Sequence, residues 1–338
     1  MSSFLKTAKR WLPGTLISLV LIGAILYFVD LPKVFAAMGS ADYLLLALAT
    51  FLAFAWMFLR AVVWRTLLGG RASYKAVLMS LGEGYLLNSI LPVRLGEIGR
   101  AYTLSRRSDM QFAEILPTVI IERVVDVGFT AAIFLAALPF VAGTSGANKI
   151  GILVGVVVVI GLLGMYVLAR NDQWALDTFH RLSARWPAVQ RLGGILEPFL
   201  AGLAVLTEGW LFARFLFWMT LNWALAIVNY YVLMRAFFPQ TQIVWAMFGL
   251  GAAAFGGAIP SLPGSIGTFE GAFGGALTLL TGDQSTSLAV ALTSRFLNYL
   301  TSFVIGGYAL AREGQSISGI YRQLMSFRTK GKTDDSPV

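Results

Sequence analysis

The sequence predicts an all-α polytopic membrane protein with about six full membrane spans and two re-entrant helical hairpins, arranged as an inverted repeat. Composition is the first reason: hydrophobic residues make up 57% of the chain, charged residues only 13%, and the mean hydropathy is +0.73, all far from a soluble domain. The second reason is that several apolar runs approach the roughly 20 residues that cross a bilayer. The third is that two further apolar segments are broken by proline and charged residues.

Residues 1–338 are expected to form a single transmembrane domain, because the spans use most of the chain and leave no room for a soluble domain of ordinary size. Within it we expect repeat 1 at about 43–140, repeat 2 at about 211–311, an interfacial linker at 170–209 and a basic cytoplasmic tail at 312–338. The linker carries tryptophan and phenylalanine among arginines, a pattern typical of helices that lie at the membrane interface.

Each full span is predicted from an apolar run with polar residues at its ends. The predicted full spans are residues 14–29, 43–64, 112–140, 151–169, 211–234 and 285–311. The first run follows basic residues, so a cleaved signal peptide ending in the small residues at 36–39 is an alternative. The run is long for a signal peptide, and Pro32-Lys33 interrupts the approach to that cleavage site, which favours a retained span.

The first broken segment, residues 82–107, reads GEGYLLNSILPVRLGEIGRAYTLSRR. Its predicted break is at Leu91-Pro92, because proline lacks a backbone donor and ends helices. The segment then continues with arginine and glutamate, which are costly in hydrocarbon. Such a break inside a membrane is tolerated only where it is packed in protein or lines a wet cavity. We therefore expect a re-entrant hairpin over residues 76–105, with Pro92 and Gly96 at a tip that is part of a site.

The second broken segment is a predicted hairpin over residues 243–280, with its tip at Pro260, Pro263, Gly264 and Gly267. The two segments correspond. Leu91-Pro92-x-x-Leu95-Gly96 recurs as Leu262-Pro263-x-x-Ile266-Gly267, and at nearly the same offset Arg123 and Asp126 recur as Arg295 and Asn298. An internal repeat with a broken helix in each half indicates a transporter-type site at the repeat interface. Chance is the alternative, because small residues and proline are common in membrane helices.

The distribution of Lys and Arg predicts the orientation. Of the 26 such residues, we place Arg60, Arg94, Arg123 and Arg295 in the membrane, and Lys33, Lys149 and Arg235 outside it. The remaining Lys and Arg residues lie on the same side of the membrane as both termini. Because basic residues are enriched in cytoplasmic loops, this side is predicted to be cytoplasmic. The 43–64 helix then runs inward and the 211–234 helix outward, as expected for inverted halves. The net charge of +9 reflects this positive-inside bias and requires no nucleic acid partner.

Arg94, Arg123 and Arg295 are the leading candidates for ligand binding. An arginine at the centre of a span costs about 2.5–3.5 kcal/mol on insertion scales, so it normally has a compensating partner and a role. Its planar guanidinium suits the oxygens of phosphate and carboxylate. We expect these arginines to bind an anionic lipid headgroup while the acyl chains stay in the bilayer.

A purely structural role is the alternative for these arginines. Glu83, Glu97, Glu122 and Asp126 could pair with them only to neutralise their charge. Arg123 and Asp126 stand at positions i and i+3, so local pairing is easy, and both roles stay open for Arg123. The position of Arg94 at a hairpin tip favours substrate contact for that residue.

Further polar residues complete the candidate site. The predicted substrate-binding set also contains Glu97, Arg100, Asp126 and Glu270, and the predicted supporting polar residues are Asn88, Glu122 and Asn298. Glu270 follows the second tip with no arginine near it in sequence. It could receive a cationic headgroup or a proton, or cap a helix, and the cap is slightly favoured. The tip glycines allow tight turns, and helices that begin after the tips could aim N–H groups at an anion.

Catalytic and cofactor motifs are missing from the sequence. The chain has no cysteine, which excludes disulfides, thiol nucleophiles and cysteine-based metal sites. The single His180 excludes a multi-histidine metal site and a Ser/His/Asp set within the membrane. Gly331-Lys332-Thr333 lacks the rest of a Walker A motif, so we expect no ATP-driven transport by this chain alone. No cofactor or metal is expected.

Three motifs together resemble one known family. They are Asn88-x-x-Leu91-Pro92-x-Arg94-x-Gly96-Glu97-x-x-Arg100, Glu122-Arg123-x-x-Asp126 and Pro260-x-x-Pro263-Gly264-x-x-Gly267-x-x-Glu270. Over residues 10–312 the chain resembles the lysylphosphatidylglycerol synthase transmembrane-region family, the flippase-like domain of bacterial multiple-peptide-resistance factors and of stand-alone inner-membrane proteins. The resemblance implies lipid translocation, two hairpins that face each other, and a bacterial inner (plasma) membrane location. Members that make the lysyl-lipid carry a cytosolic transferase domain after the last span; here residues 312–338 follow, so no synthetase activity is expected.

The function that we predict is translocation of an anionic or modified lipid between leaflets, by a flippase or lipid transporter that is not an enzyme. A non-catalytic partner of a lipid-modifying or lipid-synthesising enzyme is one alternative. A membrane-embedded transferase with Glu97 or Asp126 as base is less favoured, because it needs an acceptor site and usually a carboxylate cluster that binds metal. The expected partner is a membrane lipid with an anionic headgroup, and an oligomer is compatible with the sequence.

Overall fold

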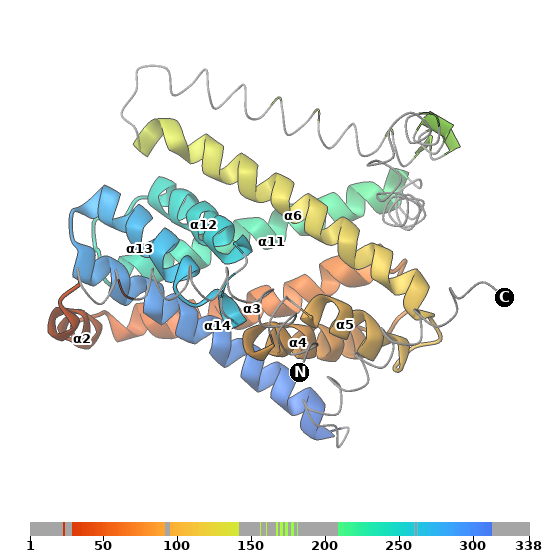
Figure 1. Cartoon of the computed structure of the whole chain (residues 1–338), viewed down its shortest axis with the longest axis horizontal. Coiled ribbons are helices and arrows are strands. Elements are labelled where there is room, and N and C mark those ends of the chain that lie inside the picture. The colour runs from red at the N-terminus through yellow and green to blue at the C-terminus, as the bar shows by residue number, and fades with distance from the viewer. Residues whose placement is uncertain are drawn as a thin grey trace, which may run out of the picture.

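The computed structural model is described here for residues 29–91, 95–141, 209–259, 261 and 263–312, together with isolated positions elsewhere in the chain. Every regular element in these ranges is a helix (Figure 1). Four are long and apolar enough to cross a membrane: α3 (Tyr43–Leu67), α6 (Phe112–Val141), α11 (Gly209–Arg235) and α14 (Gln284–Arg312). The prediction of a polytopic α-helical membrane protein is therefore confirmed.

Several predicted segments lie wholly or mostly outside the described residues. They are the spans at 14–29 and 151–169, the linker at 170–209 and the tail at 312–338. Residues 36–39, which the signal-peptide alternative uses, belong to the short helix α2 (Leu31–Gly39), and α2 packs against α14. Asp30 begins α2 by accepting a hydrogen bond from the backbone N–H of Lys33.

Helices α3 and α11 pack against each other in antiparallel orientation (Figure 1). At the start of α3, the backbone N–H of Asp42 donates to the carbonyl of Ala236, just after the end of α11, at 2.8 Å. Further along, the side-chain amide of Asn222 donates to the carbonyl of Trp56 at 3.2 Å. An asparagine inside a membrane helix needs such an interhelical partner, because hydrocarbon offers none. The order of these contacts shows that the two helices run in opposite directions.

The first broken segment forms two helices, α4 (Tyr74–Ile90) and α5 (Gly96–Ser105), that pack closely against each other. A Cβ atom at Gly96 would overlap the carbonyl oxygen of Gly84, so this approach is backbone against backbone. Asn88 joins the two helices, since its Oδ1 accepts the backbone N–H of Gly96 at 2.8 Å. The break after Leu91 is where the proline rule predicted it, and residues 92–94 lie outside the described residues.

The second broken segment forms α12 (Ile243–Ala258), the short 3-10 helix η3 (Pro263–Ser265) and α13 (Thr268–Thr281). Gly264 and Gly267 adopt φ angles of 69° and 89°, in the region that glycine reaches without strain. Glu270 begins α13, because its carboxylate accepts the backbone N–H of Gly267 at 2.7 Å. Glu270 thus has the capping role that the sequence favoured, as well as an arginine partner described below.

Helix α14 packs against members of both broken pairs, α4 and α13. Where α14 crosses α4, a Cβ atom at Gly306 would overlap the backbone of Gly82, so this crossing too is backbone against backbone. In Figure 1 the α12–α13 pair lies toward one end of the molecule and the α4–α5 pair toward the other, and α6 packs across both. η3 contacts α4, which brings the second helix break against the first pair.

Candidate functional site

A cavity of about 650 Å³ lies between the two broken-helix pairs. Residues from every long helix described, α3 to α6 and α11 to α14, and from the two breaks line it. Its wall carries the charged side chains of Arg60, Glu97, Arg123, Asp126 and Arg295. Aromatic rings and amides complete it, among them Trp56, Tyr85, Asn88, Trp223, Asn229, Tyr230, Asn298 and Tyr299. Both halves of the chain therefore contribute to one cavity, in which charged side chains stand among apolar ones.

Glu122, which the sequence marked as supporting, is the centre of the charges on the α3–α5–α6 side. Its carboxylate is fully buried and contacts three guanidinium groups. Arg60 approaches it to 2.6 Å, Arg100 to 3.2 Å and Arg123 to 3.3 Å. A buried carboxylate is normally paired in this way, because an unpaired charge in the interior is costly. Glu122 does not line the cavity, so its role is to hold the three arginines together.

Glu97 and Asp126 lie between Glu122 and the cavity. Glu97 contacts Arg100 at 3.0 Å and Arg123 at 3.3 Å. Asp126 contacts Arg123 at 3.3 Å and binds Arg60 through both of its oxygens, one of them at 2.8 Å from Arg60 Nη1. We call this group of six the central charge network: Arg60, Glu97, Arg100, Glu122, Arg123 and Asp126. Its three positive and three negative charges balance.

Arg60 is the charged residue of the cavity wall that sequence reasoning left out of the candidate site. The sequence placed it in the membrane but left it out of the site, because its carboxylate partners are on α6, far along the chain. Its Nη1 also donates to the side-chain oxygen of Asn222 at 3.3 Å. The only local signal was an arginine within an apolar span that has no acidic residue one turn away.

Arg295 forms the charged group on the opposite side of the cavity. Its Nε contacts Glu270 at 2.7 Å, and its two terminal nitrogens donate to the carbonyl oxygens of Gly264 and Ser265. The guanidinium also lies over the ring of Phe269, with its central carbon 4.2 Å from the ring centre. Arg295 therefore fixes η3 and the start of α13 to α14.

The other predicted residues fall into three groups. Asn88, Pro263, Gly264 and Asn298 line the cavity beside the charged residues. Arg100, Gly96, Gly267 and Glu270 support it from behind: the Arg100 guanidinium, for example, is buried over the ring of Trp64 at 4.7 Å. Pro92, Arg94 and Pro260 lie outside the described residues.

Two observations bear on alternatives raised by the sequence, namely Glu83 as a partner of the site arginines and a carboxylate cluster that binds metal. Glu83 pairs with Arg107 at 2.6 Å. Within the described ranges no group of three or more His, Asp or Glu side chains is arranged to hold a metal ion.

Long apolar helices, two broken-helix pairs and a charged cavity between them define a polytopic membrane protein with a buried polar site. The family model described as the lysylphosphatidylglycerol synthase TM region matches residues 11–306, and the chain belongs to this family. The resemblance seen in the sequence motifs is thus confirmed.

Two curated relatives are similar to the chain. The glycosyltransferase AglD of Haloferax volcanii is 23% identical over 294 residues, which cover 77% of this chain and 47% of AglD. A UPF0104 membrane protein of Methanocaldococcus jannaschii is 25% identical over 224 residues, which cover 65% of this chain and 91% of that protein. The chain thus spans about half the length of AglD and nearly all of the smaller relative. Together with the family, these relatives indicate a function in a membrane that is related to lipids.

Proposed function

We propose that the protein translocates a lipid with an anionic or modified headgroup between the leaflets of its membrane and is a transporter rather than an enzyme. The cavity carries this proposal, because it presents charged side chains at the breaks of two helix pairs, among helices that otherwise meet hydrocarbon. A lipid, which has a polar headgroup and apolar acyl chains, suits a charged cavity that is surrounded by membrane-spanning helices. Its headgroup would enter the cavity while its acyl chains stay in the bilayer. Family membership supports a lipid as the substrate.

The two broken-helix pairs are proposed to be re-entrant hairpins. α4 has 17 residues and α5 has 10, which at 1.5 Å per residue give lengths of about 25 and 15 Å, short of a hydrocarbon core about 30 Å thick. Each pair would therefore enter and leave from one face. The antiparallel packing of α3 and α11 supports inverted halves, with one hairpin from each face. We place both termini on the cytoplasmic side of the inner (plasma) membrane.

Arg123 is the arginine that the central charge network can release to a ligand. Its side chain is 33% exposed, whereas those of Arg60 and Arg100 are 2% exposed. If a lipid phosphate took Arg123, Glu97 would keep Arg100 and Asp126 would keep Arg60. No carboxylate would lose its last partner, so the exchange avoids the large cost of an unpaired buried charge. We therefore assign headgroup binding to Arg123 and positioning to Arg60 and Arg100.

The test is lipid movement in vesicles that contain only the purified protein and lipids with a fluorescent headgroup label. Arg123→Lys keeps the charge but loses the two-pronged geometry of the guanidinium, so it should fold normally and move lipid at least tenfold more slowly. Arg235→Lys is the matched control, because Arg235 lies at the end of α11, away from the cavity, and contacts only Tyr231 among the described residues. Wild-type rates from Arg123→Lys would show that this arginine does not bind the headgroup.

A second candidate is that the chain is the membrane part or membrane partner of an enzyme that modifies lipids. One observation favours it: the relative AglD carries the name of a glycosyltransferase and is about twice as long as the matched segment. In that case the cavity would present a lipid-linked substrate to a separate catalytic unit. The vesicle experiment separates the two candidates, since a partner without transport activity would leave the labelled lipid in its original leaflet.

A further inference from the structure

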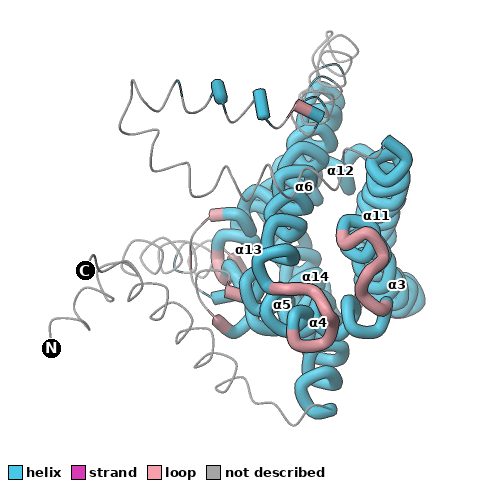
Figure 2. The backbone as a smooth tube through the Cα atoms, turned by 90° about the vertical axis from the view of Figure 1, so that its right-hand side faces the viewer, coloured by secondary structure: helices cyan, strands magenta, loops and turns pink. Residues whose placement is uncertain are grey.

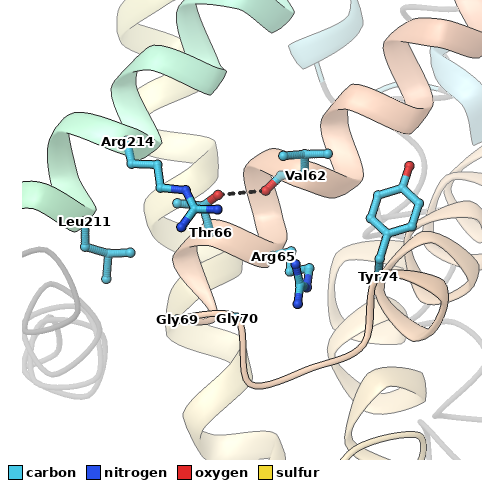
Figure 3. Close-up of a pocket in the computed structure, with 8 residues that line it drawn as sticks. All are labelled: Val62, Arg65, Thr66, Gly69, Gly70, Tyr74, Leu211 and Arg214. Carbon is cyan, nitrogen blue, oxygen red and sulfur yellow. Dashed lines mark hydrogen bonds between the residues drawn. The ribbon is translucent and has the colours of Figure 1, made fainter.

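A second hollow lies where α3 ends and α11 begins, and it shares no lining residue with the cavity (Figure 3). Its volume is about 270 Å³. The lining residues are Val62, Arg65, Thr66, Gly69, Gly70, Tyr74, Leu211 and Arg214. Figure 3 shows Arg214 reaching from α11 toward α3, while Arg65 extends beside the Gly69–Gly70 turn. Two guanidinium groups from two different helices therefore border one hollow.

Neither arginine contacts a carboxylate among the described residues. Arg65 uses only its Nε, which donates to the carbonyl of Ala72 at 3.0 Å. Arg214, whose side chain is exposed, makes no hydrogen bond or ion pair within the described ranges. Arg71, near the same end of α3, differs: it pairs with Glu114 at 2.8 Å. The arginines of the central charge network and Arg295 are paired with carboxylates as well, whereas this hollow brings together two guanidinium groups that have no such partner within the described ranges.

The hollow lies at the ends of two helices that are long enough to cross a membrane, where lipid headgroups are expected. Arg65 is in the last turn of a helix that can cross the membrane, and Arg214 is in the second turn of its antiparallel neighbour. Exposed apolar rings continue from both toward the middle of the helices: Phe58 lies two turns before Arg65 on the same face of α3, and Phe217 lies one turn after Arg214 on α11. Exposed Trp210, at the start of α11, is typical of the membrane–water interface.

We propose that this hollow binds the phosphate of an anionic lipid headgroup from the leaflet that surrounds it. The terminal nitrogens of Arg65 and Arg214 would donate to the phosphate oxygens, and the acyl chains would run over Phe58 and Phe217. Such a lipid would bridge α3 and α11, which pack against each other. This site is independent of the cavity and of the proposed transport.

The probe is phosphatidylglycerol added to the detergent-solubilised full chain, with bound lipid counted by native mass spectrometry and phosphatidylcholine as the uncharged comparison. The variant Arg65→Gln/Arg214→Gln should lose affinity for phosphatidylglycerol roughly 10- to 30-fold, as expected when two basic residues leave a headgroup site. The matched control is Arg71→Gln/Arg106→Gln, which removes the same net charge near the ends of α3 and α5 and should bind as the wild type does. The single variant Arg214→Gln removes no contact within the described part of the chain, so it should fold normally. A partial loss of phosphatidylglycerol binding by this variant would therefore not result from misfolding.

Three outcomes would overturn the proposal. In the first, the Arg65/Arg214 variant binds phosphatidylglycerol as well as the Arg71/Arg106 control does. In the second, phosphatidylcholine binds the wild type as tightly as phosphatidylglycerol. In the third, glycerol 1-phosphate or inorganic phosphate displaces the lipid at equal concentration, which would make the ligand a soluble phosphate. Lipid movement by the Arg123 variants reports on the cavity, so a failure of one proposal can be told from a failure of the other.

Discussion

Arg60 and Arg123 belong to the same charge network, but their surroundings give them different tasks. Arg60 is buried against Glu122 and Asp126, and its position is also fixed by Asn222. Arg123 contacts three carboxylates at 3.3 Å each, faces the cavity, and shares every one of these carboxylates with a second arginine. At the scale of single residues, burial and shared partners distinguish the arginine that stabilises from the arginine that is free to bind.

This difference predicts the effect of each truncation on stability. Arg60→Ala should lower the free energy of unfolding by about 3–5 kcal/mol, because it removes one partner of a buried charge pair. Arg123→Ala should cost clearly less, since Arg60 and Arg100 still neutralise the carboxylates. Unfolding by SDS in mixed micelles can compare the two. Arg60→Ala/Asp126→Asn should recover part of the loss, and a larger loss from Arg123→Ala than from Arg60→Ala would refute the division of roles.

At the scale of helices, glycines determine how closely α5 and α14 approach α4. Gly96 and Gly84 bring α5 against α4, and Gly306 and Gly82 bring α14 against α4. The conformation of the segment between α12 and α13 depends on the hydrogen bonds from Arg295 and on Gly264 and Gly267, which have positive φ angles. These contacts place the helix breaks at the cavity.

Gly96→Ala should therefore separate α5 from α4 and disturb the cavity. The added methyl group would meet the carbonyl oxygen of Gly84 and the side chain of Asn88, and overpacking of this kind costs typically about 1–3 kcal/mol. Gly128→Ala in α6 is the control, because no atom lies within 4 Å of the added Cβ and alanine favours helix. The thermal midpoint in detergent should fall for Gly96→Ala and stay level or rise for Gly128→Ala. Equal midpoints would contradict the close packing of the hairpin.

Rules that use only neighbouring residues in the sequence predicted more of the fold than of the site. The breaks after Leu91 and around Pro263, and the cap by Glu270, follow from residues within one turn of each other, so the sequence shows them directly. The partners of Arg60 and Arg295 lie on other helices, and only tertiary packing brings them together. Local spacing indicated that Arg123 could pair with Asp126, and the structure shows this pair. The two further contacts of Asp126, to Arg60 on another helix, had no signal in the local sequence.

At the scale of the whole molecule, the proposed inverted topology assigns a face of the membrane to each helix end. In the described part, exposed residues mark these ends: Lys75 and Asp109 flank the α4–α5 pair, and Gln242 and Gln284 flank the α12–α13 pair. Figure 2 shows α4 and α5 close together, with the loop at the end of α5 leading into α6.

Because the chain contains no cysteine, single cysteines at these four positions can be labelled without background. With membrane-impermeant reagents, Lys75→Cys and Asp109→Cys should react from the cytoplasmic face, and Gln242→Cys and Gln284→Cys from the opposite face. If Lys75→Cys and Asp109→Cys reacted from different faces, the α4–α5 pair would cross the membrane and would not be re-entrant. If all four reacted from one face, the halves would not be inverted.

The way α14 is held has a mechanical consequence. The backbone of α14 at Gly306 contacts the backbone of α4 at Gly82. The side chain of Arg295, also on α14, binds the segment between α12 and α13 through the carbonyl of Ser265 and through Glu270. Flexible side chains normally absorb small displacements between helices, but at this crossing the backbones of Gly306 and Gly82 meet directly, with the side chains of Ile305 and Leu86 packed beside them. A displacement of α4 would therefore move α14 as a rigid body, and α14 would move the segment between α12 and α13. In the proposed transport, opening the cavity on one side of the membrane would then be coupled to closing it on the other.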